Sequence, residues 1–446
     1  MTKSPRSYSR KNHAPFLISC LLPAITLVTL VVLLRSANAW SSQRTSSRVL
    51  SSDARKSIPS FDAAIDRRVA LQKVVTASTM VGIVALNGSE AKAAVAPQQP
   101  PPQPETTDTS AKTSPMNKRV YYPQANSLIG KNIVITGSSS GLGLESSKRL
   151  AAAGATVIMT ARSDQKASNA LAEVRQYLDE HSIKNANIYA TTLDLADMQS
   201  IKTFPKRYEE LLGSKSKMID VLINNAGVAA IPEKEMTRDG FEVTFQTNHL
   251  GPFMLTSLLF PYLNREGSRI INVSSRAHVF STIASTNEAG LDIGNLNSEV
   301  DYSGLGWPAY GRSKLENILF TQELQRRADS AGLNWLSVTA LHPGVVATDI
   351  RRNGFFGVDT RAKGNFSVQS FVSNLFYSNI IPVEEGANTQ VMLASFGERD
   401  GIMVKGQYFD ENMKLKELAG FARDEGKARY LWDKSEELAG INFVVE

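Results

Sequence analysis

The sequence predicts an α/β fold in which one central parallel sheet of about seven strands is flanked by helices on both faces. From residue 131 to the C-terminus, short apolar runs alternate with longer amphipathic stretches, which is the pattern of repeated strand–helix–strand units. The apolar runs are continuous rather than alternating with polar residues, as expected of parallel strands buried on both faces. No solenoid-type repeat is visible in the sequence, so residues 117–446 are expected to form a single doubly wound domain.

Seven apolar runs are the expected strands, and four of the stretches between them are clear helical patterns. The strands are expected at residues 132–136, 156–160, 186–191, 221–224, 269–274, 336–341 and 403–409. The helices are expected at residues 142–153, 163–180, 197–212 and 310–328. This alternation predicts parallel strands that are joined by crossover helices.

The first 39 residues have the layout of a secretory signal peptide. Residues 1–14 carry four basic and no acidic side chains, an apolar run follows at 15–34, and Ser36-Ala37-Asn38-Ala39 forms a small-x-small cleavage site. A permanent membrane anchor is the alternative, because the run approaches the ~20 residues that span a bilayer. Pro23 inside the run and the cleavage site behind it favour removal of the segment.

Residues 40–93 continue as a region similar to a plastid transit peptide. A signal peptide followed by Trp40 and a Ser/Arg-rich stretch resembles the bipartite plastid presequences of algae with secondary plastids. Arg67-Arg68, an apolar run at 74–86 and Ala91-Lys92-Ala93 are similar to a twin-arginine signal, or form an amphipathic stretch within the transit peptide. The expected location is the plastid (chloroplast), entered through the secretory-type signal, with the thylakoid lumen and thylakoid membrane as alternatives to the stroma.

A proline-rich linker separates this leader from the expected folded domain. Residues 94–116 are rich in Pro, Gln, Thr and Ser and are expected to stay extended. Residues 1–93 hold 13 Lys/Arg against 4 Asp/Glu, which leaves 36 against 39 in the rest of the chain. The net charge of +6 therefore comes from the leader, and no nucleic acid partner is expected. The one cysteine, Cys20, lies in the leader, and the five histidines lack zinc-like spacing, so no metal site is expected.

A glycine-rich turn follows the first expected strand. It reads Thr136-Gly137-Ser138-Ser139-Ser140-Gly141-Leu142-Gly143 and leads into an expected helix. Glycines allow a tight turn and a close backbone approach to a pyrophosphate, and the helix N-terminus presents free N–H groups and a partial positive charge to it. The order of strand, turn and helix predicts a Rossmann-type dinucleotide site, with an ordinary strand–helix turn as the alternative.

The end of the second expected strand bears on the choice of dinucleotide. An acidic residue there would hydrogen-bond the ribose 2′-hydroxyl and repel a 2′-phosphate. The strand ends instead in Met159-Thr160-Ala161-Arg162, and a guanidinium can bind a phosphate through two hydrogen bonds. The sequence therefore favours NADP(H) over NAD(H) as the cofactor, with a solvated surface arginine as the alternative.

Tyr310 and Lys314 form a pair suited to proton transfer. Their spacing places both side chains on one face of an expected helix. A tyrosine titrates near pH ~10, and a nearby ammonium is expected to lower that pKa toward the range useful for acid–base catalysis. Ser275, which follows an expected strand, can donate a hydrogen bond to the same substrate oxygen. A surface tyrosine beside a lysine is the alternative, and the glycine turn and Ser275 upstream argue against it.

Together these motifs resemble the short-chain dehydrogenase/reductase family from about residue 131 to residue 405. The resemblance implies that Asp194 contacts adenine, that residues 224–227 steady the central sheet, and that Asn248 holds a proton-relay water. It also implies a catalytic tetrad of Asn248, Ser275, Tyr310 and Lys314. The implied cofactor-binding residues are Gly137, Ser139, Ser140, Gly141, Leu142, Gly143, Arg162, Asp194, Leu195, Asn225, Ala226, Gly227, Tyr310, Lys314, Pro343, Gly344 and Thr348.

Three further stretches resemble the retinol-dehydrogenase and protochlorophyllide-reductase branch of that family. They are residues 248–251, 272–278 and 313–320, and the tail at 430–438 adds to them. The branch implies NADP(H) and a bulky lipophilic substrate. The 35-residue step from Ser275 to Tyr310 exceeds the family's usual gap, which predicts an inserted loop at about 282–307 beside the substrate site. The catalytic region has no cysteine, which argues against light-driven protochlorophyllide reduction.

An aromatic segment follows the sixth expected strand, at residues 353–381. Because ligands bind beyond the carboxyl ends of the strands in an open α/β sheet, this segment is placed to cover the site. It is expected to form a lipophilic lid or a membrane-facing patch, with simple packing against the core as the alternative.

The sequence thus predicts an NADP(H)-dependent oxidoreductase that interconverts an alcohol and a carbonyl on a small lipophilic substrate of retinoid, carotenoid or pigment type. A protochlorophyllide-type pigment reductase is one alternative. The other is a non-catalytic dinucleotide sensor or scaffold, which would need the glycine turn but not Tyr310. A peripheral membrane association and a homodimer are further expectations.

Overall fold

The computed structural model describes residues 119–446, apart from 185, 283–289, 303–305, 347–379 and 396–403. These residues belong to one compact unit, Ala111–Glu446. The expected signal peptide, transit region and linker (1–39, 40–93 and 94–116) lie outside the described residues. Thr348 and all of the aromatic segment except residues 380–381 also lie outside them.

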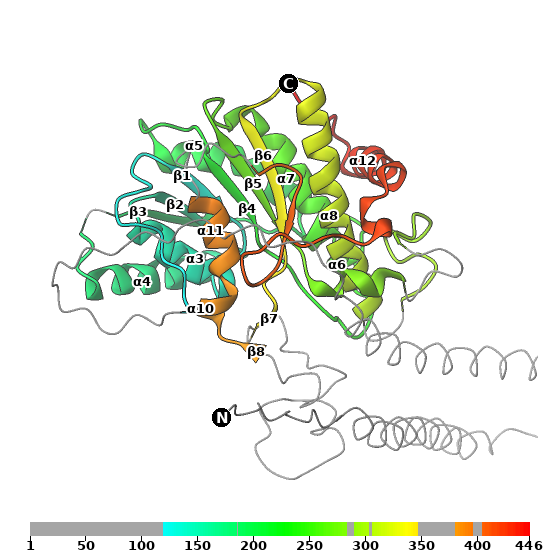
Figure 1. The fold of residues 1–446 in the computed structure, drawn as a ribbon, viewed down its shortest axis with the longest axis horizontal. Coiled ribbons are helices and arrows are strands. Elements are labelled where there is room, and N and C mark those ends of the chain that lie inside the picture. The colour runs from blue at the N-terminus through cyan, green and yellow to red at the C-terminus, as the bar shows by residue number, and fades with distance from the viewer. Residues whose placement is uncertain (1–118, 185, 283–289, 303–305, 347–379, 396–403) are drawn as a thin grey trace, which may run out of the picture. The chain divides into compact units, whose positions relative to one another are not determined.

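A seven-stranded sheet forms the centre of the fold, with the strand order β3-β2-β1-β4-β5-β6-β9 and every neighbouring pair parallel. This confirms the predicted doubly wound α/β fold (Figure 1). The order reverses between β1 and β4, where ligands bind in open α/β sheets. The strands are β1 (Asn132–Ile135), β2 (Thr156–Ala161), β3 (Asn187–Thr192), β4 (Val221–Asn224), β5 (Ser268–Val273), β6 (Leu336–Leu341) and β9 (Tyr408–Phe409).

The sheet divides the apolar core into two layers, because successive side chains of a strand face opposite sides. Val134 and Ile158 pack with α5, α7, α8 and α12 on one side. Ile135 and Met159 pack with α3, α4 and α11 on the other. The helices are α3 (Gly141–Ala152), α4 (Asp164–Glu180), α5 (Met198–Leu212), α6 (Val243–Phe245), α7 (Gly251–Leu259), α8 (Trp307–Ser330), α10 (Val383–Gly386), α11 (Asn388–Ser395) and α12 (Glu425–Ala439).

The structure confirms the four expected helices as α3, α4, α5 and α8, and no end shifts by more than three residues. Side chains that cap the first turn explain two of the starts. The Ser163 hydroxyl accepts a hydrogen bond from the Lys166 N–H, and the Asp197 carboxylate accepts one from the Gln199 N–H. Helices α7, α11 and α12 were not among the expected helices.

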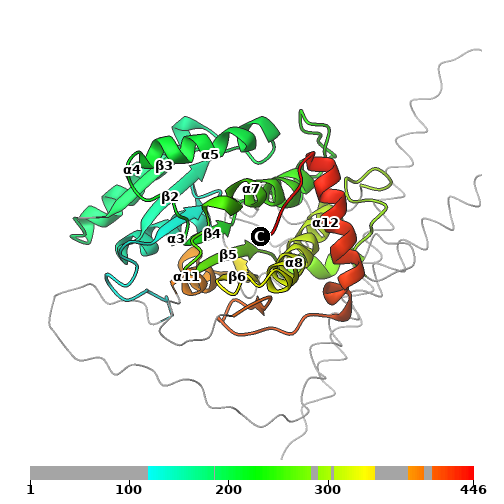
Figure 2. The same cartoon turned by 90° about the horizontal axis from the view of Figure 1, so that it is seen from above.

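The C-terminal helix α12 lies beside α8 and also contacts α7, on one side of the sheet (Figure 2). Trp432 is 1% exposed, and its ring lies 5.0 Å from the Phe253 ring and 4.8 Å from the Phe443 ring. The His249 Nε2 atom is 2.9 Å from the Ser435 hydroxyl. The helix therefore closes the core with apolar and aromatic contacts from the end of the chain.

A short two-stranded sheet lies apart from the main one. In it β7 (Val345–Val346) pairs in parallel with β8 (Ile380–Ile381). Across the described ranges, no helix combines the length and the apolar character needed to cross a membrane.

Candidate active site

The glycine-rich turn lies between β1 and α3, and two of its glycines have positive φ angles. These are Gly137, with φ +62°, and Gly141, with φ +56°. A Cβ atom added at Gly137 would lie 2.7 Å from the Ala226 Cα atom, and one added at Gly143 would lie 2.6 Å from the Asn225 Nδ2 atom. The Ser140 side chain makes no capping hydrogen bond to α3. The turn therefore packs too closely on the segment after β4 for a side chain at Gly137 or Gly143, and the first N–H groups of α3 are available to a phosphate.

The segment after β4 holds this turn in place. The Asn225 Nδ2 atom donates to the Thr136 carbonyl at 2.8 Å, and the Asn225 and Ala226 N–H groups both donate to the Thr136 hydroxyl at 3.0 Å. These bonds join the ends of β1 and β4, the two strands at which the sheet order reverses. The structure thus gives Asn225 and Ala226 a bracing role, and both line the groove together with Gly227.

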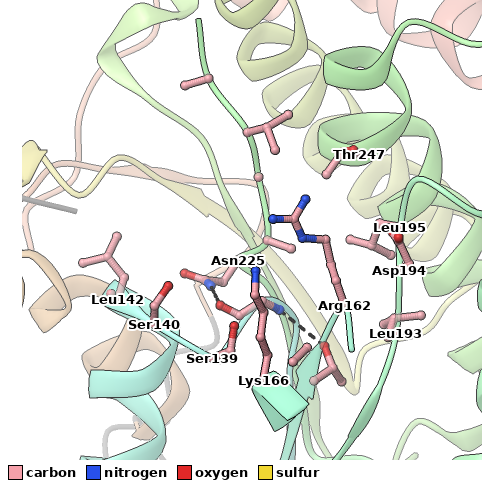
Figure 3. A pocket seen from close by; sticks show the side chains of 18 of the residues that line it. Ser139, Ser140, Leu142, Arg162, Lys166, Leu193, Asp194, Leu195, Asn225 and Thr247 are labelled. Atoms are coloured by element: carbon pink, nitrogen blue, oxygen red, sulfur yellow. Dashed lines mark hydrogen bonds between the residues drawn. The ribbon is translucent and has the colours of Figure 1, made fainter. Parts of the chain in front are cut away.

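A groove of about 570 Å³ runs past this turn and along the ends of β2, β3 and β4 (Figure 3). Eleven of the predicted cofactor-binding residues line it: Gly137, Ser139, Ser140, Gly141, Leu142, Arg162, Asp194, Leu195, Asn225, Ala226 and Gly227. Gly143, Tyr310, Lys314, Pro343 and Gly344 do not line it, and the close contact of Gly143 with Asn225 gives that glycine a packing role instead.

Sequence reasoning missed a second basic side chain in the groove. Lys166 lies four residues after Arg162, in the first turn of α4, and both residues line the groove and are exposed. Figure 3 labels both side chains among those that line the groove. The i, i+4 spacing from the end of a strand into a helix was the available signal, but a lysine on an amphipathic helix is usually solvated.

Asn248 is fully buried in a short π-helix, η1 (Gln246–Leu250), which precedes α7. Its Nδ2 atom donates to the Val228 carbonyl at 2.8 Å and to the Ser313 hydroxyl at 2.9 Å. Its Oδ1 atom accepts from the Val228 N–H at 2.8 Å. The side chain therefore ties η1 to α8 and to the segment after β4. Single π-helical turns inside α-helices are frequent at functional sites.

Ser275, Tyr310 and Lys314 meet where β5 ends and α8 begins. The Tyr310 hydroxyl is hydrogen-bonded to the Ser275 side chain, and the Lys314 Nζ atom lies 5.7 Å from the centre of the Tyr310 ring. Lys314 is 2% exposed, and its Nζ atom donates to the Val273 carbonyl at 2.8 Å. A Cβ atom added at Gly227 would lie 3.4 Å from this Nζ atom and 3.2 Å from the Asn248 Oδ1 atom. The structure therefore brings all four predicted catalytic residues to the edge of the groove.

Burial decides the protonation of these groups. It raises the pKa of Tyr310 above its usual value, although the hydrogen bond from Ser275 acts in the opposite direction. It lowers the pKa of Lys314 to about 8, since the ammonium loses its hydration. The expectation that Lys314 brings the pKa of Tyr310 down is therefore not met in this structure, because loss of solvent is the largest effect and only the hydrogen bond from Ser275 opposes it.

An apolar cluster lies against Tyr310. It consists of Ala229, Ala230 and Ala277 with Tyr310 itself, and Trp307 packs against it. The Trp307 and Tyr310 rings are 5.8 Å apart in an edge-to-face arrangement. Part of the predicted inserted loop is described, at residues 290–302, and the Tyr302 hydroxyl donates to the Ile231 carbonyl at 2.6 Å. Among the described residues, no cluster of His, Cys, Asp and Glu is arranged to hold a metal ion.

Comparison with known proteins agrees with this geometry. The family model described as short chain dehydrogenase matches residues 131–287. Retinol dehydrogenase 14 of Mus musculus is 38% identical over 318 residues, which cover 70% of this chain and 86% of that protein. Retinol dehydrogenase 13 of Homo sapiens is 34% identical over 328 residues, with 72% and 87% covered. A crystal structure of an uncharacterized protein from Mycobacterium paratuberculosis is 30% identical with a TM-score of 0.53, and the match covers 73% of this chain and 99% of that one.

These relatives correct one expectation and establish another. They are proteins of mouse and human, and animals have no plastids, so the plastid location predicted from residues 1–93, with its thylakoid alternatives, is contradicted. The similarity to the retinol dehydrogenases extends over most of their length. The chain belongs to the short-chain dehydrogenase/reductase family, in its retinol dehydrogenase-like branch.

Proposed function

We propose that this oxidoreductase uses NADP(H) to interconvert an alcohol and a carbonyl on a small lipophilic substrate, with Tyr310 as the general acid and base. The observation that carries the proposal is the Ser275–Tyr310–Lys314 cluster at the edge of the dinucleotide groove. When bound, the nicotinamide exchanges a hydride with the substrate carbon. The glycine turn fits such a dinucleotide, because Gly137 and Gly141 line the groove and Gly137 holds a positive φ angle in close contact with Ala226.

Tyr310 handles the proton of this reaction. In the direction of reduction, its hydroxyl gives a proton to the carbonyl oxygen as that oxygen gains charge, and in oxidation the phenolate removes it. The raised pKa keeps the hydroxyl protonated at neutral pH, which suits reduction. The Ser275 hydroxyl donates a hydrogen bond that stabilises negative charge on the Tyr310 oxygen or on the substrate oxygen.

Lys314 supplies the positive charge that the developing phenolate needs. With a pKa of about 8 its ammonium is the main form at neutral pH. Of the partners within the described residues, only the Val273 carbonyl accepts a hydrogen bond from the Nζ atom, so two further N–H bonds can reach the ribose hydroxyls of the cofactor. Burial of this charge is a cost that a non-catalytic dinucleotide sensor would not require, which argues against the scaffold alternative.

Asn248 fixes the π-helical turn η1, and we expect a backbone carbonyl of that turn to take part in the proton path. Because both amide hydrogens of its side chain are engaged by Val228 and Ser313, we expect a relay water to be held by a main-chain carbonyl of η1. A π-helical turn breaks the regular hydrogen-bond pattern of the helix and can leave a carbonyl available.

Arg162 and Lys166 support the preference for NADP(H). Both line the groove near the end of β2, where the adenosine ribose binds in this fold. A 2′-phosphate between a guanidinium and an ammonium would form charge-assisted hydrogen bonds with both. No acidic residue takes the place of Arg162 at the end of that strand.

The lipophilic substrate class rests on the apolar cluster beside Tyr310. Three alanines and Trp307 pack with Tyr310 and give its surroundings a small and aromatic surface, which suits a carbonyl on an apolar chain or ring. The curated relatives are named as retinol dehydrogenases, and a retinoid is the first substrate to test.

The test follows NADPH absorbance in the dark with retinal, an apocarotenal, a carotenoid ketone and protochlorophyllide. We expect turnover of at least one lipophilic carbonyl, and a loss of about 10²–10⁴-fold in Tyr310→Phe with NADPH binding retained. Tyr430→Phe is the matched control, because that tyrosine is 41% exposed on α12, and it should behave as wild type. Unchanged turnover in Tyr310→Phe would overturn the catalytic assignment, and tight NADPH binding without turnover of any carbonyl would favour the scaffold alternative.

A further inference from the structure

His278 ends the 272–278 stretch and has no role in the proton path described above. It lies in the 3-10 turn η3 (Arg276–Thr282), which directly follows Ser275. The His278 Nδ1 atom is 2.8 Å from the Ser275 carbonyl oxygen, and the His278 backbone N–H donates to the same oxygen at 3.1 Å. Two donors from one residue therefore converge on the backbone of Ser275.

The carbonyl partner determines the form of the imidazole ring. A carbonyl oxygen only accepts hydrogen bonds, so at 2.8 Å the Nδ1 atom must carry a hydrogen. His278 is 8% exposed, and its burial lowers the pKa of the ring below the usual value. The ring is therefore neutral at pH 7, with a hydrogen on Nδ1 and none on Nε2.

Aromatic side chains from the other end of the chain hold the ring in this orientation. The Tyr408 ring, from β9, meets it edge to face with 5.6 Å between the ring centres. The Phe421 ring lies 6.3 Å away at a tilted angle. Contacts on two sides restrict rotation of the imidazole and keep Nδ1 aimed at the carbonyl.

The turn held by His278 sets the direction of the Ser275 hydroxyl. The Ala277 N–H donates to the Ser275 Oγ atom at 3.1 Å. A hydroxyl that accepts a bond at one lone pair keeps its own hydrogen for another partner. Here that partner is the Tyr310 oxygen, to which the Ser275 side chain is hydrogen-bonded.

We propose that His278 is a positioning residue, whose Nδ1–H bond to the Ser275 carbonyl holds the turn that aims the Ser275 hydroxyl at Tyr310 and the substrate oxygen. The inference rests on the proposed carbonyl reduction. His278 does not line the groove and acts through Ser275.

The first experiment compares two substitutions of His278. His278→Leu removes the donor, and we expect kcat to fall about a hundredfold, the loss that a misplacement of about 1 Å can cause, with NADPH affinity and the KM for NADPH unchanged. His278→Asn keeps a donor on the atom that corresponds to Nδ1. Its kcat should be at least tenfold higher than that of His278→Leu. His181→Leu is the matched control, because the His181 Nδ1 atom also lies 2.8 Å from a backbone carbonyl, that of Tyr177, at an exposed site.

A double-mutant cycle separates positioning from loss of packing. If His278 acts through Ser275, then Ser275→Ala/His278→Leu should be no slower than Ser275→Ala alone. Additive losses, or equal rates for His278→Leu and wild type, would overturn the inference. A wild-type protein that turns over no carbonyl would instead overturn the proposed function, so the two failures are distinguishable.

A readout without turnover checks the same bond. In ¹⁵N NMR of the cofactor-free protein at pH 7, the His278 ring should show a protonated Nδ1 and an unprotonated Nε2. The opposite tautomer, or rapid exchange between the two, would contradict the hydrogen bond to Ser275 and with it the inference.

Discussion

Substitution of Gly137 by alanine tests the glycine turn more directly than removal of any side chain. The added Cβ atom would lie 2.7 Å from the Ala226 Cα atom and 2.8 Å from the Ala226 Cβ atom. Carbon atoms pack at about 3.5–4.0 Å, so the glycine turn and the segment after β4 would have to separate by close to ~1 Å. The hydrogen bonds of Asn225 and Ala226 to Thr136 would lengthen as a result.

The expected size of the effect has two parts. A left-handed backbone costs an alanine about 1–2 kcal/mol, whatever surrounds it. Displacement of the packed backbone adds about 1–3 kcal/mol. Gly440→Ala isolates the first part, because Gly440 has φ +63° against +62° for Gly137, and a Cβ atom there meets nothing within 4 Å.

Two measurements distinguish the variants. Denaturant unfolding should show that Gly137→Ala loses about 1–3 kcal/mol more stability than Gly440→Ala. NADPH titration by energy transfer from protein fluorescence should show at least a tenfold weaker affinity for Gly137→Ala, which corresponds to about 1.4 kcal/mol, and no change for Gly440→Ala. If both variants bind NADPH as wild type and lose equal stability, the contact with Ala226 does not shape the glycine turn and the reasoning fails.

Three further predictions concern the preference for NADP(H), the stability of the fold at low pH and the packing of α12. Arg162→Asp and Lys166→Asp should each shift the ratio of kcat/KM with NADPH to kcat/KM with NADH by roughly tenfold in favour of NADH. The shift is smaller than removal of a buried charged hydrogen bond would give, because both side chains are exposed. No shift would mean that other residues bind the 2′-phosphate. Burial lowers the pKa of His249 to about 3, so the folded state binds fewer protons than the unfolded state and stability falls as the pH drops below about 6.5, by about 2 kcal/mol at pH 5. Unfolding curves of His249→Phe should lack this part of the acid sensitivity, and an identical pH dependence would contradict it. Trp432→Ala should cost about 3–5 kcal/mol of unfolding free energy, whereas Tyr430→Ala on the same helix should cost less than about 1 kcal/mol.

The strands and the glycine turn were predictable because each depends on a few neighbouring residues. Continuous apolar runs located all seven strands of the sheet within a few residues, although of the run at 403–409 only Tyr408–Phe409 is strand. The turn at 136–143 was recognisable because close backbone approach restricts a position to glycine. The groove therefore followed from local sequence.

The electrostatics and the supporting contacts were not predictable, because they depend on burial and on distant segments. The pKa of Tyr310 moves up rather than down since the folded chain removes the hydroxyl from water, which sequence spacing does not reveal. His278 is held by Tyr408, which lies 130 residues further along the chain. Lys166 resembled any solvated helix residue until the structure placed it in the groove.

The packing of α12 has a consequence for the biosynthesis of this chain. The π-helical turn that carries Asn248 also carries His249, and His249 finds its partner Ser435 only 186 residues later. At about 5–20 residues per second, the ribosome takes on the order of 10–40 s to reach that helix after it has translated Asn248. Until then, the Phe253 ring has His249 and Phe320 as neighbours but lacks the contacts that Trp432 and Phe443 later add. A stop codon between residues 424 and 443 would therefore behave as an active-site mutation, although it removes none of the residues that line the groove.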